Sequence, residues 1–95
     1  MSVANIIKDQ IGGKALFMLG AKNLLDHNGA LSFRIGRNAK SVNYIKITLN
    51  AMDTYDIEYG RVHGAKYKVK NSSDEVYVDM MHKDIEANTG MYTSL

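Results

Sequence analysis

Few side chains of this chain are able to support catalysis or bind a metal, and they are widely spaced. The three histidines are His27, His63 and His82, and no pair has the spacing that places two zinc ligands on one helix face. Cysteine is absent, so a thiol nucleophile, a zinc ribbon and disulfides are excluded. No serine or threonine has a histidine at a spacing typical of a catalytic triad. We therefore predict a non-enzyme with no catalytic residue, no metal site and no cofactor.

Two carboxylates, Asp56 and Glu58, alternate along one predicted strand and should share its outer face. Paired carboxylates can perform acid–base chemistry. Lys46 on the preceding strand is a natural cross-strand partner, because opposite charges commonly face each other on exposed sheets. We favour this charge pairing over catalysis.

The basic residues are concentrated in the middle of the chain. Residues 14–70 contain ten Lys/Arg and four Asp/Glu, a local charge of +6, and residues 71–95 contain one Lys and five Asp/Glu, a local charge of −4. Such asymmetry is typical of proteins that bind an anionic partner. For the asymmetry itself we favour a different explanation, in which the acidic C-terminal helix pairs with the basic sheet of the same chain or of a second copy.

The basic residues alternate with apolar residues along the predicted strands. Some single-strand-binding proteins use such a basic sheet face to bind phosphates, and stack bases on an exposed aromatic side chain. The candidate nucleic-acid-binding residues occupy outward strand positions and two loops: Arg34, Arg37, Lys40, Tyr44, Lys46, Lys66, Lys68 and Lys70. A single outward tyrosine is fewer than the aromatics of a typical RNA-recognition sheet.

The elements that position these residues are short strands between Leu31 and Lys70. Apolar and polar residues alternate there, which predicts one apolar and one solvated sheet face. The expected inward positions are Leu31, Phe33, Ile35, Ile45, Ile47, Leu49, Tyr55, Ile57, Tyr59, Tyr67 and Val69. Asn28-Gly29 predicts a tight hairpin turn, because a type I′ turn needs two positive φ angles. For residues 14–25 we favour a strand with a bulge at Gly20, and helix is the alternative.

Helices are expected at both ends of the chain. Val3, Ile6, Ile7 and Ile11 have helical spacing, and Gly12-Gly13 should end this helix. Ser72 and Glu75 fit a capping box that opens a second helix. Its predicted apolar face contains Val76, Tyr77, Met80, Met81 and Ile85, and Thr89-Gly90 should end it.

Together these patterns predict a single α+β domain over residues 1–95. It consists of an antiparallel meander of four to five strands, with an N-terminal and a C-terminal helix packed on one face. No apolar run approaches the length of a membrane span. The lack of cysteine favours a reducing compartment, and we expect a cytoplasmic protein without a membrane partner.

Short motifs spread over nearly the whole chain carry a resemblance to known proteins. They are Gly12-Gly13, Gly20-Ala21-Lys22-Asn23, Leu31-Ser32-Phe33, Arg37-Asn38-Ala39-Lys40, Lys46-Ile47-Thr48-Leu49 and Thr89-Gly90-Met91-Tyr92-Thr93-Ser94-Leu95. In this combination the chain resembles a family of small uncharacterised proteins of tailed phages, prophages and other mobile elements. The family has no established activity, so the resemblance implies only an accessory role in a host cytoplasm.

We therefore expect a non-enzymatic accessory protein that binds a host or element protein. Met91, Tyr92 and Leu95 in the apolar C-terminal tail are the candidate protein-interface residues. The alternative is a nucleic-acid-binding protein that uses the basic sheet face. A second copy of the chain is a further candidate partner, and no small-molecule substrate is predicted.

Overall fold

The structure is a computed structural model that describes residues 3–93. Five strands form one antiparallel sheet in the order β1-β2-β3-β4-β5, which confirms the predicted meander and the α+β fold. The strands are β1 (Lys22–Asp26), β2 (Ala30–Arg34), β3 (Tyr44–Leu49), β4 (Tyr55–His63) and β5 (Lys66–Val76). The helices are α1 (Val3–Ile11), α2 (Gly13–Met18), the 3-10 turn η1 (Val78–Met80) and α3 (Met81–Thr89).

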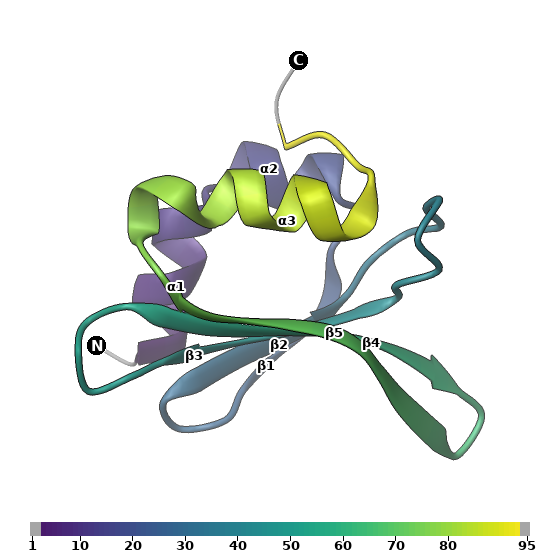
Figure 1. Cartoon of the computed structure of the whole chain (residues 1–95), viewed down its shortest axis with the longest axis horizontal. Helices are drawn as coiled ribbons and strands as arrows, with labels where there is room; N and C mark the ends of the chain where they lie inside the picture. The colour runs from purple at the N-terminus through teal and green to yellow at the C-terminus, as the bar shows by residue number, and fades with distance from the viewer. Residues whose placement is uncertain (1–2, 94–95) are drawn as a thin grey trace.

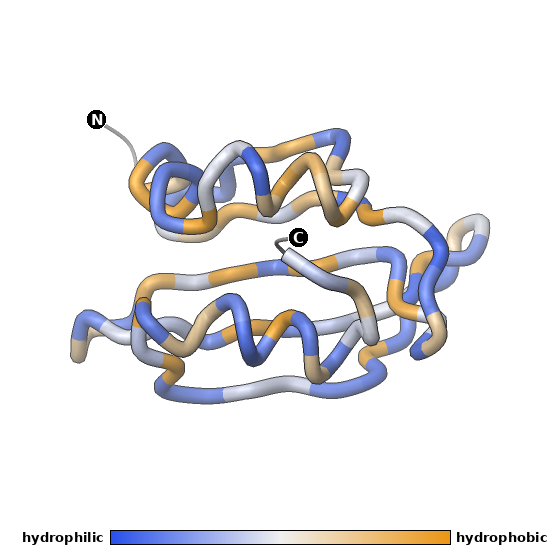
Figure 2. Tube along the Cα trace, turned by 90° about the horizontal axis from the view of Figure 1, so that it is seen from above, coloured by the Kyte–Doolittle hydropathy of each residue, from blue (hydrophilic) through white to orange (hydrophobic). Residues whose placement is uncertain are grey.

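The helices cover one face of the sheet and leave the other to solvent (Figure 1). Figure 2 shows α1 and α2 lying beside α3 in a single layer. The core between the layers contains fully buried side chains from both, among them Ile7, Ile11, Ile45, Ile57 and Ile85. Within residues 3–93, no helix is long and apolar enough to cross a membrane.

The largest fully buried side chain, Tyr59, is polar at its tip. Its hydroxyl donates a hydrogen bond to Asp84 Oδ2 of α3 at 2.5 Å. Burial, together with the neighbouring Asp84 carboxylate, raises the pKa of Tyr59 far above its ordinary value. This bond fixes α3 against β4, because a buried hydroxyl without a partner would be costly.

The predicted inward positions of β2, β3 and β4 are confirmed. Leu31, Phe33, Ile45, Ile57 and Tyr59 are each at most 3% exposed. The predicted turn is also confirmed, since Asn28 has a φ of 54° and Gly29 a φ of 111° between β1 and β2. These elements follow directly from period-two alternation and turn chemistry.

The preference for a strand over residues 14–25 was wrong in its first half. Gly13–Met18 form α2, and only Lys22–Asp26 form a strand. Gly12 ends α1 with a φ of 90°, and the chain resumes a helix at once. The short apolar run of this segment fits either state, and packing of Ala15 and Leu16 into the core selects helix.

The predicted start of the C-terminal helix at Ser72 was wrong as well. Ser72 and Ser73 belong to β5 and pair with Glu58 and Ile57. The α-helix begins only at Met81, and no side chain caps it. Pairing with β4 overrides the local capping signal here, because tertiary contacts outweigh helix propensity.

Tyr67 and Val69 were predicted to face inward, and the structure places them on the outer face. The register between β4 and β5 shifts at Tyr59–Gly60, where Asn71 and Val69 are the paired residues. A one-residue slip moves every following side chain to the other face of a sheet. Tyr67 and Val69 are consequently 44% and 49% exposed. Lys66 and Lys68 lie on the face that the helices cover elsewhere.

Candidate functional site

Most of the cationic side chains lie at one end of the molecule, which we call the basic end. Three surface hollows there are connected, because two of them share Arg61 and two share Lys70. Their linings contain eight of the twelve Lys/Arg residues and no Asp or Glu: Lys22, Arg34, Arg37, Lys40, Arg61, Lys66, Lys68 and Lys70. The basic end is therefore a continuous surface of one charge sign.

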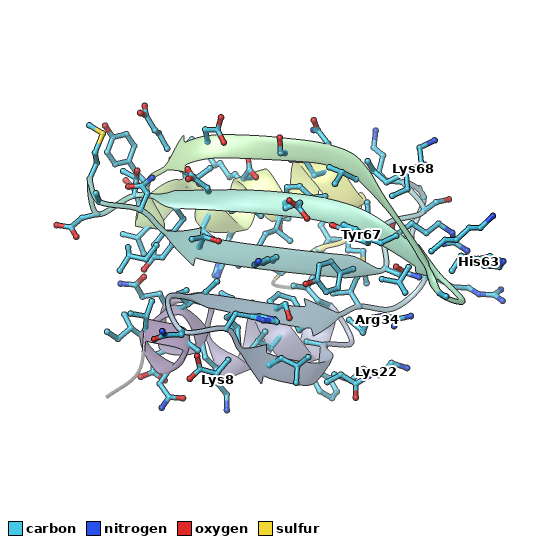
Figure 3. All side chains as sticks on the ribbon, turned by 90° about the horizontal axis from the view of Figure 1, so that it is seen from below. Lys8, Lys22, Arg34, His63, Tyr67 and Lys68 are labelled. Atoms are coloured by element: carbon cyan, nitrogen blue, oxygen red, sulfur yellow. The ribbon has the colours of Figure 1, made fainter. Side chains whose placement is uncertain are left out.

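The largest of the three, here called the arginine hollow, has a volume of about 510 Å³. Lys22 at the start of β1, Arg34 at the end of β2, Arg37 in the following loop and Arg61 in β4 line it. Lys22 and Arg34 are paired across β1 and β2. In Figure 3 both side chains lie toward the end of the sheet that also holds His63 and Lys68, away from Lys8.

Two asparagines hold the walls of the arginine hollow in place. Asn38 Nδ2 donates to the Gly36 carbonyl at 3.0 Å, and Asn38 Oδ1 accepts from the Val42 amide at 3.1 Å. Asn43 Oδ1 accepts from the Val62 amide at 2.7 Å, and Asn43 Nδ2 donates to the Val62 carbonyl at 2.8 Å. The loop from β2 to β3 is thus fixed both internally and to β4. Its position does not depend on the cations.

The other two hollows extend the basic surface along the β4–β5 hairpin, which projects beyond the helix layer (Figure 1). The lysine hollow, of about 310 Å³, is lined by five basic residues and one aromatic residue: Arg61, His63, Lys66, Lys68, Lys70 and Tyr67. A third hollow of about 360 Å³ joins Lys70 to Lys40 beside α3. Anionic groups on an extended ligand would therefore meet cations along the whole hairpin.

The cations of the basic end have almost no partners within the protein. Among residues 3–93, none of them lies within 4.0 Å of a carboxylate oxygen. The Arg61 guanidinium donates one long bond of 3.5 Å to the Ser41 carbonyl. Arg34 Nε is buried and has no acceptor. A buried donor without an acceptor costs about 1–3 kcal/mol, so the bonding of Arg34 is incomplete within the folded protein.

The outer face beside the basic end is apolar. Tyr44 and Tyr67 make an edge-to-face contact, with ring centroids 5.2 Å apart. The Tyr67 ring lies over Gly60, where a Cβ atom would come within 2.3 Å of it. An open groove of about 400 Å³ contains Tyr44, Leu25, Val62 and also Arg34. The groove and the arginine hollow therefore adjoin at Arg34.

Farther along the same face, charges of both signs alternate in what we call the mixed-charge strip. Lys46, Asp56, Glu58 and Asp74 line a shallow hollow there. Lys46 lies opposite Glu58 in the register of β3 and β4, so the two residues are cross-strand neighbours as predicted. The predicted charge pair itself is not formed within 4.0 Å among residues 3–93. Both β4 acids also have hydrogen-bonding roles: Asp56 Oδ1 accepts from the Glu75 amide at 3.1 Å, and Glu58 Oε2 accepts from the Tyr67 hydroxyl at 2.5 Å.

The structure therefore assembles the predicted basic residues differently from a single basic sheet face. Arg34, Arg37, Lys40, Lys66, Lys68 and Lys70 come together at the basic end. Lys46 lies apart from them in the mixed-charge strip. Tyr44 is outward, as predicted, but lines the apolar groove.

Sequence reasoning missed Lys22 and Arg61 as site residues. For Lys22 a sequence signal existed, because a hairpin centred on Asn28-Gly29 places residues 22 and 23 nearly opposite Arg34. Lys22 was nevertheless not selected, because residues 14–25 were expected to form one strand with a bulge at Gly20, which leaves the register opposite Arg34 undefined.

The predicted interface residues of the C-terminal tail have different environments. Met91 packs partly buried against the core, Tyr92 is 74% exposed, and Leu95 lies outside the described residues. The tail is held back on α3, because the Thr93 amide and hydroxyl each donate to Glu86 Oε2 at 2.9 Å. These two bonds lower the pKa of Glu86 below its ordinary value.

No group of three His, Asp or Glu side chains suited to a metal ion occurs within residues 3–93. The described part of the chain thus presents one conspicuous chemical feature, the acid-free basic end. In comparisons with known proteins, no family model matches the chain, and no curated protein or solved structure matches it significantly.

Proposed function

We propose that this chain is a non-enzymatic binding protein whose basic end takes nucleic acid. The observation that supports this most strongly is the gathering of eight Lys/Arg residues around three connected hollows without an acid in any lining. Lys and Arg neutralise backbone phosphates and release condensed counterions, which supplies sequence-independent affinity. We also propose an accessory role in a phage or other mobile element, and the sequence resemblance alone supports that context.

Single strands suit this surface better than duplex. The apolar groove with Tyr44 adjoins the arginine hollow at Arg34. A phosphate at Arg34 would bring the neighbouring base toward the groove, and exposed aromatic and apolar surface is what unstacked bases contact. The bases of a duplex are already stacked and paired, so they would not reach this groove.

The test is fluorescence-polarisation titration with labelled single- and double-stranded DNA and RNA at about 50 and 200 mM salt. The variant K66A/K68A/K70A removes three cations of the basic end. The control variant K8A/K14A/K83A removes three exposed helix lysines that line none of the three hollows. We expect the unmodified protein to bind in a salt-sensitive way. Binding should weaken only in the first variant, where the slope of log affinity against log salt concentration should fall by about 1 per lost phosphate contact. Absence of binding at the lower salt would reject the proposal.

A protein partner is the second candidate, and the apolar groove favours it. Leu25, Tyr67 and Val69 on the same outer face are each at least 44% exposed. Exposed apolar clusters of this kind are typical of interaction surfaces. The partner would be a host or element protein, or a second copy whose acidic residues meet the basic end.

Sedimentation at low and high protein concentration distinguishes a self-partner from a foreign one. Self-association should weaken in L25S and in K66A/K68A/K70A if the two surfaces meet between copies. A protein that is monomeric at every concentration would reject the homodimer. The foreign partner would then be tested by whether L25S abolishes the complex that the unmodified protein forms with that purified partner.

A further inference from the structure

The arginine hollow differs from the rest of the basic end in being a built site. Its walls are fixed by the asparagine bonds described above, whereas Lys66, Lys68 and Lys70 project from the exposed hairpin. Its volume of about 510 Å³ lies within the range of small-ligand pockets, roughly 300–1,000 Å³. It is therefore able to take a discrete group as well as a length of backbone.

The polar chemistry of the hollow points to a compact anion with several acceptor oxygens, such as phosphate. Three of its four cations are arginines, whose fork of donors matches phosphate oxygens in pairs. Arg34 Nε–H is buried without an acceptor, while the Asn38 and Asn43 amides already bond to the backbone. The donors available to a ligand are thus the guanidinium groups and the Lys22 ammonium, of which, among residues 3–93, only Arg61 makes a bond within the protein, the long one to the Ser41 carbonyl.

Charge distinguishes between the two kinds of phosphate in nucleic acid. An internal phosphodiester carries one negative charge, and a terminal phosphate monoester carries about −1.5 to −2 at neutral pH. Four cations around one hollow are better neutralised by the monoester. A diester at the same place would leave most of their mutual repulsion uncompensated.

We infer that the arginine hollow is a seat for a phosphate monoester, with Arg34 as its principal donor and Lys22, Arg37 and Arg61 around it. The inference deepens the proposed function and rests on it where the monoester is taken as the end of a nucleic-acid strand. A free mononucleotide offers the same chemistry, and the experiment separates these two sources.

The experiment compares three probes by ¹⁵N–¹H NMR titration of the full chain: a six-nucleotide single strand with a 5′-phosphate, the same strand with a 5′-hydroxyl, and a 5′-mononucleotide. We expect the phosphorylated strand to bind at least about tenfold more tightly than the hydroxyl strand, with amide shifts centred on residues 35–43 and 61. R34K keeps the charge and loses the planar fork of guanidinium donors, so it should reduce this preference to within about threefold. R37Q should also reduce the preference for the phosphorylated strand. Because Arg37 lies in an exposed loop, this variant tests the hollow even if R34K fails to fold.

K68A is the matched control, because Lys68 belongs to the neighbouring lysine hollow. It should weaken both strands equally and leave the preference intact. Equal binding of the two strands to the unmodified protein would overturn the monoester seat while leaving the proposed function in place. A preference that survives both R34K and R37Q would overturn the assignment to this hollow. Arg34-dependent binding of the mononucleotide alone would uphold the seat and reject the nucleic-acid function, and binding of none of the three probes would reject both.

Discussion

The basic end and the mixed-charge strip lie on the same five-stranded sheet and use charge in opposite ways. In the strip, the β4 acids have structural partners: Asp56 accepts from Asn50 and from the Glu75 amide, and Glu58 accepts from Tyr67. At the basic end, within residues 3–93, the only hydrogen bond donated by a cationic side chain is the long one from Arg61 to Ser41. The strip therefore contributes to folding, whereas the basic end carries charge that folding does not use.

This difference shows where to look for function in a chain without recognisable catalytic residues. Like charges held together repel, and their mutual repulsion opposes folding. A surface that keeps eight cations without counterions is consequently better explained by a ligand than by stability.

The largest effect is expected from charge reversal at matched positions in the two regions. R61E places a carboxylate between the arginine and lysine hollows and should weaken single-stranded nucleic-acid binding by more than about tenfold at low salt. K46E makes the same change of charge in the strip and should weaken it by less than about threefold. Polarisation titrations of both variants measure this. Equal losses would mean that net charge, rather than the basic end, controls binding.

For the free energy of unfolding we expect the opposite order, with larger effects in the mixed-charge strip than at the basic end. D56A removes the acceptor of the Glu75 amide and of Asn50 Nδ2, and should lower the free energy of unfolding by about 1–3 kcal/mol. K66A/K68A removes two cations without partners and should change it by less than about 0.5 kcal/mol. Urea denaturation followed by circular dichroism gives both values. A lysine variant as destabilised as D56A would show that the basic end has a structural role.

Gly60 lies under the Tyr67 ring, and its substitution tests the packing of Tyr67. A Cβ atom there would meet the Tyr67 ring at 2.3 Å, so G60A should displace the ring and cost about 1–2 kcal/mol. In a Y67A background the same substitution should cost much less. A double-mutant cycle measures the coupling, and additive effects would contradict the observed ring position.

The smallest effect concerns pH and the C-terminal tail. The Thr93 bonds lower the pKa of Glu86 in the folded state. Their stabilising contribution is therefore present above the ordinary carboxyl pKa and is lost as the pH falls through the lowered value. An NMR acid titration should show the Thr93 amide signal moving with Glu86, and T93A should return Glu86 toward its ordinary pKa. Titration of Glu86 at its ordinary value in the unmodified protein would exclude this attachment of the tail.

Much of the fold could be predicted because alternation and turn chemistry are local. Asn28-Gly29 and the inward positions of β2 to β4 follow from periods of two and from positive φ. The position of β5 could not be predicted in the same way, because its register shift is set by pairing with β4: Asn71 and Val69 face the consecutive residues Tyr59 and Gly60, which leaves Lys70 as an extra residue. That slip exchanged the faces of Tyr67 and Lys68 and thereby moved the lysines away from the outer face.

The candidate site was predictable in composition but not in assembly. Arg34, Arg37 and the three lysines of β5 are evident as a basic set, and the sequence gives no distance between them. Their meeting at one end depends on the hairpin register and on the loop that Asn38 holds. Lys46 was included in the basic set by its charge and strand pattern, although the sequence also predicted it as the neighbour of the β4 carboxylates, and it lies opposite Glu58.

The most direct test of the central claim is NMR mapping of a short single-stranded oligonucleotide on the unmodified protein. If the basic end binds nucleic acid, the amides that shift should fall within residues 34–43 and 60–71, and those of the mixed-charge strip at residues 46–48 and 56–58 should remain in place. Shifts centred on the strip, or none at a salt concentration of about 50 mM, would contradict it.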